Sequence, residues 1–493
     1  MASSNRTQVV SVKETTVGTT PNTPRMRTRR VNSENTSLVP TFTASNEMRS
    51  DRMQSDVLRN GLQSGGSIAY DFIYPFPDSP NDVDLCSAFY NTFTKMAERY
   101  NDGTADSVIT GIATSGTVAT VTTGTAFVAG QLVLFSGFGV TGNNGVFKCT
   151  TGSATVPAFT GSGITDEAVP PGTARMKVVG FQGASADITA TATGLGSTAL
   201  DFTTLGLSVG QWIKIGGTAT SDKFAAAALN GTARITAIAA NALTLDHRPT
   251  GWTTDSGTSK TIKVWTGDFI YNGTTQTGQS IEVGFLGQGT PNYRLMTGMV
   301  VSQASFSFEL NQPIIANYTF QGMGGSYSTS AQDAIPDSAL AIASYPAFVN
   351  RVHVARVTEG GSTITSPNFV RGLTINLNNN STMVESIDAQ AAQGITGHSV
   401  EVTGTLNDYF GDNTLLTKYF AGTATSLACY VYNSAVNQAI LFHVPRIIYA
   451  GDGNPNASGR NVDVMLPLSF TASKDETVTN AMIWFQRFAY VEA

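Results

Sequence analysis

The sequence predicts a mainly β protein, a sandwich of sheets flanked by one or two short helices, in which one β-rich unit occurs twice and carries two small inserted β modules. Three observations lead to this fold class. Short runs of alternating apolar and polar residues recur between clusters of Gly, Asn and Ser. The order strand, helix, strand occurs early in the chain and again late. Between these parts lies a stretch rich in Thr, Ala and Gly that has internal similarity of its own.

Length and charge set the first limits on function. A chain of 493 residues with 13% charged residues is long enough for several cores, so we expect more than one domain. The net charge is −6, and nearly all of the excess lies in residues 267–493, which hold 16 acids against 9 bases. An acidic chain does not bind nucleic acid through its phosphates, although it can form a wall past which nucleic acid slides.

The sequence contains no candidate membrane span, since no segment approaches the roughly 18 apolar residues that a span needs. The amino terminus, Met1–Arg6, lacks the apolar core of a secretory signal. Cys86, Cys149 and Cys429 lie far apart, which argues against a disulfide framework and against a zinc site. We therefore expect synthesis in a reducing cytoplasm.

The first copy of the unit opens with polar residues and a long exposed segment. Residues 1–24 read as a loop or arm, and a strand starts near Met26. The segment Asn32–Asn60 has few apolar residues and predicts a long hairpin or arm used for contact. The strand Ser67–Phe72 follows it.

An amphipathic helix is predicted over residues 82–100. Asp82 or Asp84 is placed to cap it by accepting bonds from the first backbone N–H groups. The apolar residues recur at spacings of three and four, so they share a face that we expect to pack on a sheet. These residues are Leu85, Phe89, Phe93, Met96 and Tyr100.

Two tandem modules interrupt the first copy. Phe127–Val133 resembles Leu207–Ile213 around a Gly-Gln pair, and Asn144–Thr150 resembles Asn230–Thr236 around an Asn-Gly pair. Each module has about 80 residues, a normal size for a small domain. We expect the insertion at an exposed loop tip, where the parent sheet stays intact.

The second copy repeats the order of elements. The strand Ser399–Gly404 precedes a short helix over Asp412–Phe420. Alternation predicts that the strand Ser302–Leu310 closes the first copy and that Val462–Phe470 closes the second. The predicted domains are residues 1–104 with 267–345 (first unit with its amino-terminal arm), 105–184 (first module), 185–266 (second module) and 346–493 (second unit).

A catalytic or metal site is not indicated. The four histidines, His247, His353, His398 and His443, show no metal-ligand spacing, and His443 is expected to be a half-buried residue with its hydrogen bonds satisfied. Gly-Gln-Gly at 287–289 lacks the third glycine of a dinucleotide loop. Asp452–Asn456 resembles a calcium loop but lacks the closing glutamate, so turn formation explains it better. We expect no enzymatic activity, cofactor or metal.

Four arginines, Arg25, Arg27, Arg29 and Arg30, form the one local basic cluster in the first part of the chain. Three of them alternate, which suits one face of a strand. They pair with acids of a neighbouring subunit, or contact nucleic acid, or form a solvated face. Without interleaved aromatic residues the signal for nucleic-acid binding is weak.

Three motifs resemble the opening of the tail tube proteins of long-tailed, siphovirus-type bacteriophages. They are a Gly-Thr-Thr-Pro opening within Glu14–Pro21, the segment Glu47–Arg52, and the Gly-Ser-hydrophobic strand Gly66–Phe72. The Gly-Gln modules also look like insertions of such proteins. The resemblance covers about the first 100 residues well, the inserted modules loosely, and the carboxyl half mainly by the order of its elements.

The resemblance implies a structural virion protein, the major tail tube subunit. Its sheets join edge to edge into rings, and the rings stack into a hollow tube that conducts phage DNA without binding it specifically. Such closure removes free strand edges. A duplicated unit favours a trimeric ring with pseudo-six-fold symmetry over a hexamer. Expected partners are further copies of the chain, the tape measure protein, and the tail tip and terminator proteins at the tube ends. The expected location is the phage tail, assembled in the host cytoplasm.

Within such a tube, the long arm is expected to tie stacked rings together. Glu47, Arg49, Asp51 and Arg52 are the candidate inter-ring contacts, and the inserted modules decorate the outside. Small Ser, Thr and Asn residues suit the bore. Two other functions remain open from the residues themselves: an adhesin-like surface protein whose inserted modules bind glycans or a receptor, and a depolymerase, for which no groove of carboxylates is indicated.

Overall fold

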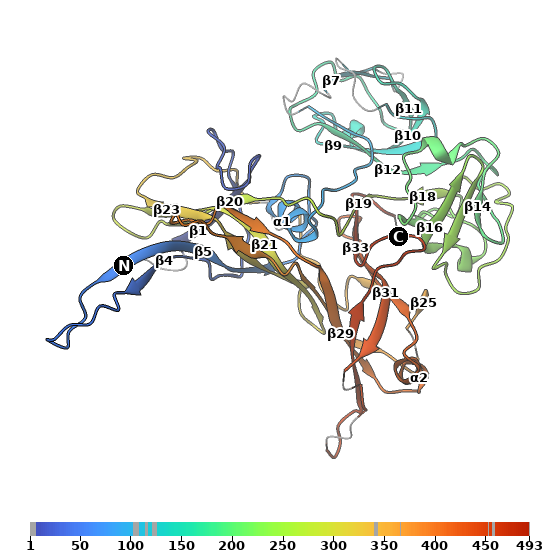
Figure 1. The fold of residues 1–493 in the computed structure, drawn as a ribbon. Helices are drawn as coiled ribbons and strands as arrows, with labels where there is room; N and C mark the ends of the chain where they lie inside the picture. Colours follow the sequence, from blue (N-terminus) through green and yellow to red (C-terminus); the bar gives the residue numbers. More distant parts are fainter. Residues whose placement is uncertain are drawn as a thin grey trace.

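Strands dominate the computed structural model, which describes residues 6–101, 108–113, 117–120, 126–339, 344–364, 366–451, 453–455 and 459–492. This part of the chain holds two short α-helices, and the predicted mainly β fold is confirmed. Figure 1 shows an elongated body of long strands with a hairpin projecting at one end and a separate group of smaller strands, residues 109–265, above the other.

The body contains two sets of strands that follow each other in the chain. The first set comprises β1 (Thr7–Lys13), β4 (Ser37–Ala44), β5 (Val57–Asp71), α1 (Pro80–Phe89), β20 (Gln279–Phe285), β21 (Asn292–Glu309), β22 (Ile315–Gly322) and β23 (Gly324–Ser328). The second set comprises β24 (Val354–Glu359), β26 (Val370–Asn378), β29 (Glu401–Tyr409), α2 (Thr414–Ala421), β30 (Thr425–Asn433), β31 (Gln438–Ala450), β32 (Met465–Ala472) and β33 (Trp484–Phe488).

Each antiparallel pairing among these elements of the first set has a counterpart in the second. The pairs β1–β20, β4–β5 and β5–β22 correspond to β24–β30, β26–β29 and β29–β32. The pairs β20–β21, β21–β22 and β21–β23 correspond to β30–β31, β31–β32 and β31–β33. The long strands β21 and β31 each have a register shift against the preceding strand. The shift lies opposite Gln279/Ile281 in the first set and opposite Thr425/Leu427 in the second. Pairing of β21 with β26 joins the sets into one continuous sheet.

This correspondence differs from the one that alternation suggested. The segment Ser302–Leu310 belongs to β21, whose counterpart is β31, whereas Val462–Phe470 overlaps β32, whose counterpart is β22. Val462 itself is exposed and precedes its strand. Alternation reports which face of a strand is buried, but it carries no information on which strand lies beside it.

The predicted helix over residues 82–100 is wrong in length and in its cap. Helix α1 ends at Phe89, where Tyr90 adopts the left-handed conformation, and residues 98–100 form β6 against β12 (Arg175–Gln182). The Ser79 hydroxyl caps the helix by accepting from the Asp82 backbone N–H, and Pro80 follows it. Phe93 and Met96 are buried as expected, but from a loop that follows the helix.

The inserted strands show the internal repeat that the sequence indicated. The Oε1 atoms of Gln131 and Gln211 each accept from a backbone N–H three residues earlier, at 2.8 and 3.0 Å. Asn144 and Asn230 each close a turn by bonding the backbone six residues earlier through both amide atoms. The two groups of strands share one sheet, because β12 pairs with both β9 (Gln131–Ser136) and β18 (Lys263–Trp265).

The inserted strands are anchored on the body by a buried apolar cluster that includes Trp212, Trp265, Leu441 and Trp484. The Gln486 side chain reinforces this junction, since it accepts from the Trp212 N–H at 2.8 Å and donates to the Trp212 carbonyl at 2.7 Å. The contact therefore fixes the insertion firmly in place.

Candidate assembly arm and tube-lining sheet

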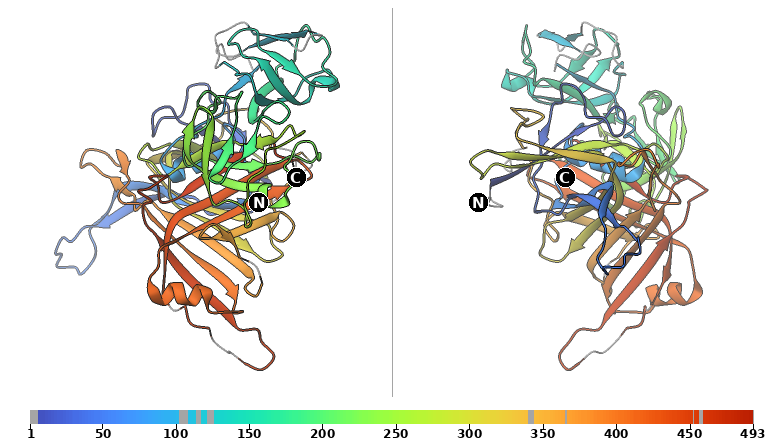
Figure 2. Two further views of the ribbon diagram at one scale, coloured as in Figure 1. Left: turned by 90° about the vertical axis from the view of Figure 1, so that its right-hand side faces the viewer. Right: turned by 60° about the vertical axis from the view of Figure 1, so that its left-hand side comes forward.

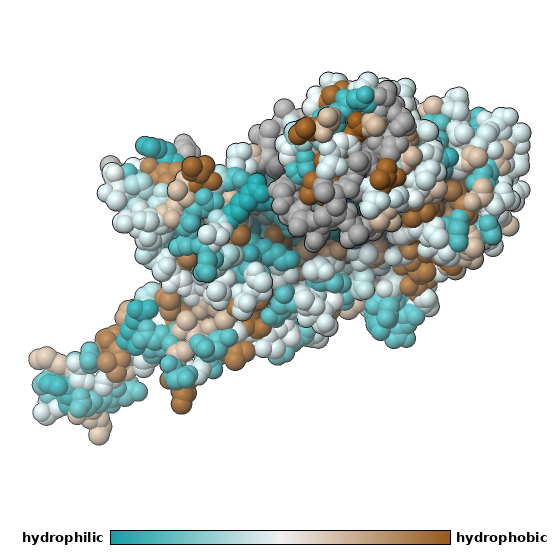
Figure 3. Space-filling view, turned by 90° about the horizontal axis from the view of Figure 1, so that it is seen from above, coloured by the Kyte–Doolittle hydropathy of each residue, from teal (hydrophilic) through white to brown (hydrophobic). Residues whose placement is uncertain are grey.

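The first arm, residues 37–65, is the hairpin of β4 and β5. Its strands pair from Ser37↔Gly65 out to Ala44↔Val57, with one register shift at Thr41/Phe42. Figure 1 shows it reaching away from the body, as the sequence predicted, and in Figure 3 hydrophobic residues interrupt its hydrophilic surface. Val39, Phe42, Val57 and Leu58 are about half exposed or more.

The four candidate inter-ring residues lie at the tip of the first arm. Glu47, Arg49, Asp51 and Arg52 are all exposed. Arg49 donates to Asp51 with an Nη2–Oδ2 distance of 2.7 Å, and Arg52 takes a left-handed backbone conformation in the turn. The structure thus gathers the four residues in one turn, where an exposed ion pair adds little stability to the chain itself.

Within the basic cluster only Arg29 is buried, and Arg25, Arg27 and Arg29 all bond within their own chain. Arg29 is buried and donates to both carboxylate oxygens of Asp84, at 2.8 and 3.0 Å. Arg25 and Arg27 lie 2.9 and 4.0 Å from Asp337. The interpretation of Arg29 as part of a solvated or DNA-contacting face is therefore wrong. The alternating arginines do not share an exposed face, because the Arg29 side chain is directed into the core.

A second buried ionic cluster fixes the start of α1. The fully buried Arg487 pairs with Asp82, and its Nε lies 3.0 Å from Asp268 Oδ2. Lys177 lies 2.9 Å from the other oxygen of Asp268. Burial opposes ionisation of Asp268, but the two cations outweigh it and hold the pKa of its carboxyl below the usual value. The cluster joins the carboxyl-terminal strand β33 to α1.

One face of the central sheet is lined by small uncharged polar side chains. Across β22, β21 and β26, Ser305 lies between Asn317 and Asn376, and its hydroxyl donates to Asn376 Oδ1 at 2.7 Å. The opposite face carries the buried residues, such as Phe306 and Ile375. The polar face continues along the same three strands through Gln303, Thr319, Thr374 and Asn378. It extends onto the flanking strands β5, β29 and β32 through Ser67, Thr403, Thr405, Ser469 and Thr471.

Charges on this polar face are few and negative. Among its described positions on β5, β22, β21, β26, β29 and β32, the charged residues are Asp71, Glu309 and Glu401, and none is Lys or Arg. They lie toward the ends of the strands. A surface of hydroxyl and amide groups with carboxylates at its margins offers phosphates no cationic partner.

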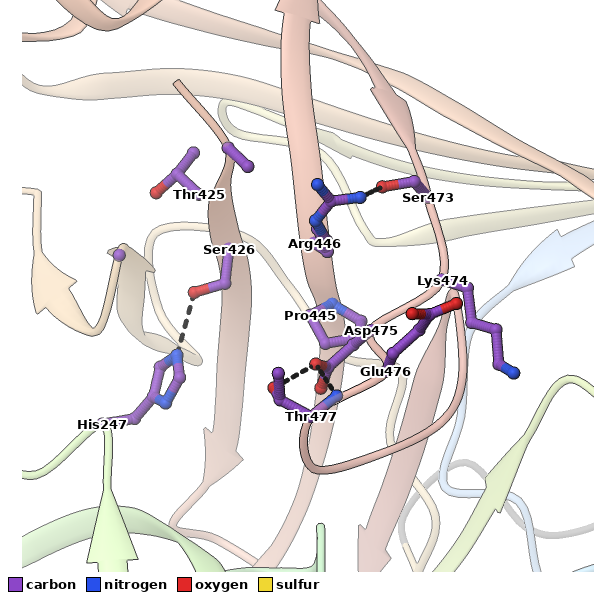
Figure 4. A pocket seen from close by; sticks show the side chains of 12 residues that line it. His247, Thr425, Ser426, Pro445, Arg446, Ser473, Lys474, Asp475, Glu476 and Thr477 are labelled. Carbon is purple, nitrogen blue, oxygen red and sulfur yellow. Dashed lines mark hydrogen bonds between the residues drawn. The ribbon is translucent and has the colours of Figure 1, made fainter. Parts of the chain in front are cut away.

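A pocket of about 800 Å³ opens between the second set and the inserted strands (Figure 4). His247 bonds the Ser426 hydroxyl at 2.8 Å, and Arg446 donates to the Ser473 hydroxyl at 2.7 Å. In the first set the corresponding place is filled by Glu14, whose Oε1 accepts from Ser280 Oγ at 2.7 Å and from Gly298 N at 2.9 Å. The pocket therefore lies where the Glu14 side chain closes the first set.

His443 is fully buried rather than half-buried, and among the described residues neither ring nitrogen has a hydrogen-bond partner. Its ring packs against those of Trp212 and His247. Burial, together with the charge of Arg234 and the neighbouring His247, lowers the pKa of His443 well below the usual value. The expectation of satisfied hydrogen bonds was wrong, and sequence alone gave no signal for this aromatic cluster.

The described residues contain no group of three or more His, Cys, Asp or Glu side chains placed to hold a metal ion. The three cysteines are free and buried. Asp452 and Asn456 of the possible calcium loop lie outside the residues that the structure describes. No helix within the described ranges is long and apolar enough to cross a membrane.

A family model described as phage tail tube protein matches residues 183–472, more than half of the chain. The chain belongs to the phage tail tube protein family. It is thus a structural protein of the phage tail. No curated protein matches it. The match covers the later inserted strands and the body up to β32, whereas the motifs within residues 14–72 that first suggested the family lie outside it.

Proposed function

We propose that this tail tube protein is the major tube subunit of a non-contractile, siphovirus-type tail, and that three chains close into a ring of six similar units. The one-to-one correspondence of strand pairings between the two sets carries this proposal. Since β21 and β26 join the two sets edge to edge within one chain, the same kind of edge remains to be joined between chains. A ring satisfies every such edge.

In this proposal the first unit comprises residues 1–104 and 267–345, and the second comprises 346–493. Residues 105–184 and 185–266 are the two inserted modules, which lie outside the tube, because placing them in the bore would block it. The exposed arm tip with Glu47, Arg49, Asp51 and Arg52 contacts the next ring in the stack.

The neutral polar sheet face lines the bore in this proposal. DNA passes over hydroxyl and amide groups, and the acidic excess of residues 267–493 repels phosphates over a range of about 8 Å at physiological salt. The tape measure protein occupies the growing tube, and the terminator and tip proteins close its ends. Assembly takes place in the host cytoplasm.

Sedimentation of the purified full chain over a wide concentration range, with negative-stain images of the fastest species, tests the proposal. We expect a monomer that converts into rings and hollow tubes as concentration rises. A chain that stays monomeric at every concentration contradicts the proposal.

A further inference from the structure

The second arm, residues 376–403, packs on the first strand set of its own chain. Its outer strands are β27 (Thr382–Val384) and β28 (Gly394–Thr396). Ile395 of β28 is buried against Tyr90, just past α1, and Val300 of β21. At the base of this arm, the Asn379 side chain donates to the carbonyl oxygens of Ala88 and Val301, at 3.0 Å each.

The two arms have matching registers. The pair Ser37↔Gly65 corresponds to Asn376↔Thr403, since Gly66 and Gly404 both lie opposite the Phe of the neighbouring strand, β22 or β32. From this shared pair, each arm pairs again at the residue six positions later in its first strand and seven positions earlier in its second strand. The resulting pairs are Thr43↔Leu58 in the first arm and Thr382↔Thr396 in the second arm. The next pairs out, Ala44↔Val57 and Met383↔Ile395, therefore also correspond. Val57 is the counterpart of the buried Ile395, yet it is 56% exposed.

The surface of the first strand set on which the second arm packs, formed by Tyr90 and Val300, has a counterpart on the second strand set. The shared register shift aligns Met299 with Ile447, and therefore Val300 with Ile448. Helices α1 and α2 both end at a left-handed residue, Tyr90 and Gly422. On the second set this surface is uncovered.

Two apolar side chains stand open on that surface. Ile448 is 36% exposed where Val300 is fully buried. Phe420, on the last turn of α2, is 72% exposed and takes the place of Ala88 relative to the helix end. The surface also borders the pocket beside Arg446 and Ser473. Exposed apolar groups gathered in this way mark a contact surface.

We propose that the first arm of one chain docks on the second strand set of the next, with Val57 against Ile448, as the second arm docks on the first strand set within the chain. This inference rests on the proposed ring. The first arm and α2 lie at opposite ends of the molecule (Figure 1), so the contact joins chains head to tail. A head-to-tail contact closes into a ring when its rotation permits.

One difference defines the character of the contact. Pro40 occupies the position of Asn379 and has neither a side-chain amide nor a backbone N–H to donate. The contact between chains therefore lacks the two hydrogen bonds that fix the second arm. It depends on apolar side chains of the arm, Val57 foremost, and this makes it sensitive to a single buried charge.

Cross-linking tests the pairing directly. The full chain carrying Val57→Cys and Ile448→Cys is assembled and treated with a short bismaleimide. The native cysteines are buried and do not compete. We expect covalent dimers and trimers on a denaturing gel. The single variants, and Val57→Cys combined with Val169→Cys on the exposed surface of the first module, remain monomeric. Rings that form normally but yield no covalent oligomer with the first pair overturn the inference and leave the proposed function standing.

A charge introduced at the same position gives a second test. Val57→Asp is expected to raise the concentration needed for ring formation at least about tenfold, whereas Leu58→Asp leaves it within about twofold, because the counterpart Thr396 stays exposed in the second arm. Equal assembly by both variants overturns the inference. If the unmodified chain never forms rings, the proposed function and this contact fail together.

Discussion

Val300 and Ile448 occupy corresponding positions on β21 and β31, yet Val300 is fully buried and Ile448 is 36% exposed. The difference comes from Ile395, which covers Val300 from the second arm of the same chain. No segment of the described chain covers Ile448 to the same extent. A single chain thus carries one docked arm and one undocked arm.

Phe420→Ser is expected to weaken assembly without weakening the fold. The side chain is 72% exposed, so its loss should change the free energy of unfolding by less than about 0.5 kcal/mol. Ring formation should need several-fold more protein, which sedimentation measures. Val169→Ser, at a side chain that is 86% exposed within the inserted strands, serves as the control. Loss of folding stability on a par with the loss of assembly would contradict the assignment.

Arg487→Met is expected to destabilise the chain by about 3–5 kcal/mol, because it leaves Asp82 and Asp268 buried without their shared cation. Urea unfolding measures the change. Arg49→Met removes an ion pair at the exposed arm tip and should leave the urea midpoint almost unchanged. Similar losses in both variants would show that the buried cluster does not hold β33 to α1.

His443 should make the fold sensitive to mild acid. Its folded-state pKa is depressed, so below an unfolded-state pKa of about 6.5 the unfolded chain takes up a proton that the folded chain does not. Stability is therefore present above that pH and is lost as pH falls. The charged groups around it are Arg234, Asp246 and Asp475, and the neighbouring imidazole is that of His247.

His443→Phe keeps an aromatic ring beside Trp212 and should reduce the loss of stability between pH 7.5 and pH 5.5, as urea midpoints report. The control is His398→Gln on an exposed loop, which should retain the slope of the unmodified chain. An unchanged slope in the Phe variant would rule out His443 as its source.

Asp408 has the opposite pH dependence. Burial, with the nearby charge of Asp412, raises the pKa of its carboxyl to about 6. Its stabilising contribution is complete below about pH 4 and is lost as pH rises through 6. Asp408→Asn should therefore gain stability at pH 7 relative to the unmodified chain and lose that gain near pH 4. Asp463→Asn, at an exposed site, is the matched control for thermal unfolding.

Asn317→Lys tests which sheet face meets DNA. Asn317 is exposed on the neutral polar face, and three chains would place three lysines in each ring. Tubes should still assemble, but they should retain DNA with an affinity that falls steeply as salt rises. Asn317→Asp should retain none. Equal behaviour of the two tubes would mean that this face does not line the bore.

Local patterns in the sequence were sufficient for the elements whose structure is local. The arm, the strand β5 and the paired Gly-Gln and Asn-Gly turns of the insertion follow from turn chemistry and alternation. The end of α1 could not be predicted in this way, because the left-handed residue that ends the helix is Tyr90 and not the glycine that usually marks such an end.

Contacts between distant residues lay beyond the sequence. Arg29 and Asp84 are 55 residues apart, and Trp212 and Gln486 are 274 apart, so neither pairing leaves a local pattern. The correspondence of β21 with β31 likewise became visible only through shared neighbours and a shared register shift. Figure 2 shows strands from early, middle and late parts of the chain, in blue, yellow and red, side by side in the body.

The symmetry of the assembled particle tests the central claim most directly. Electron cryomicroscopy of the tubes, viewed along their axis, should show three chains per ring, six similar lobes and a continuous open channel. Six chains per ring, or a particle with no channel along its axis, would contradict the account.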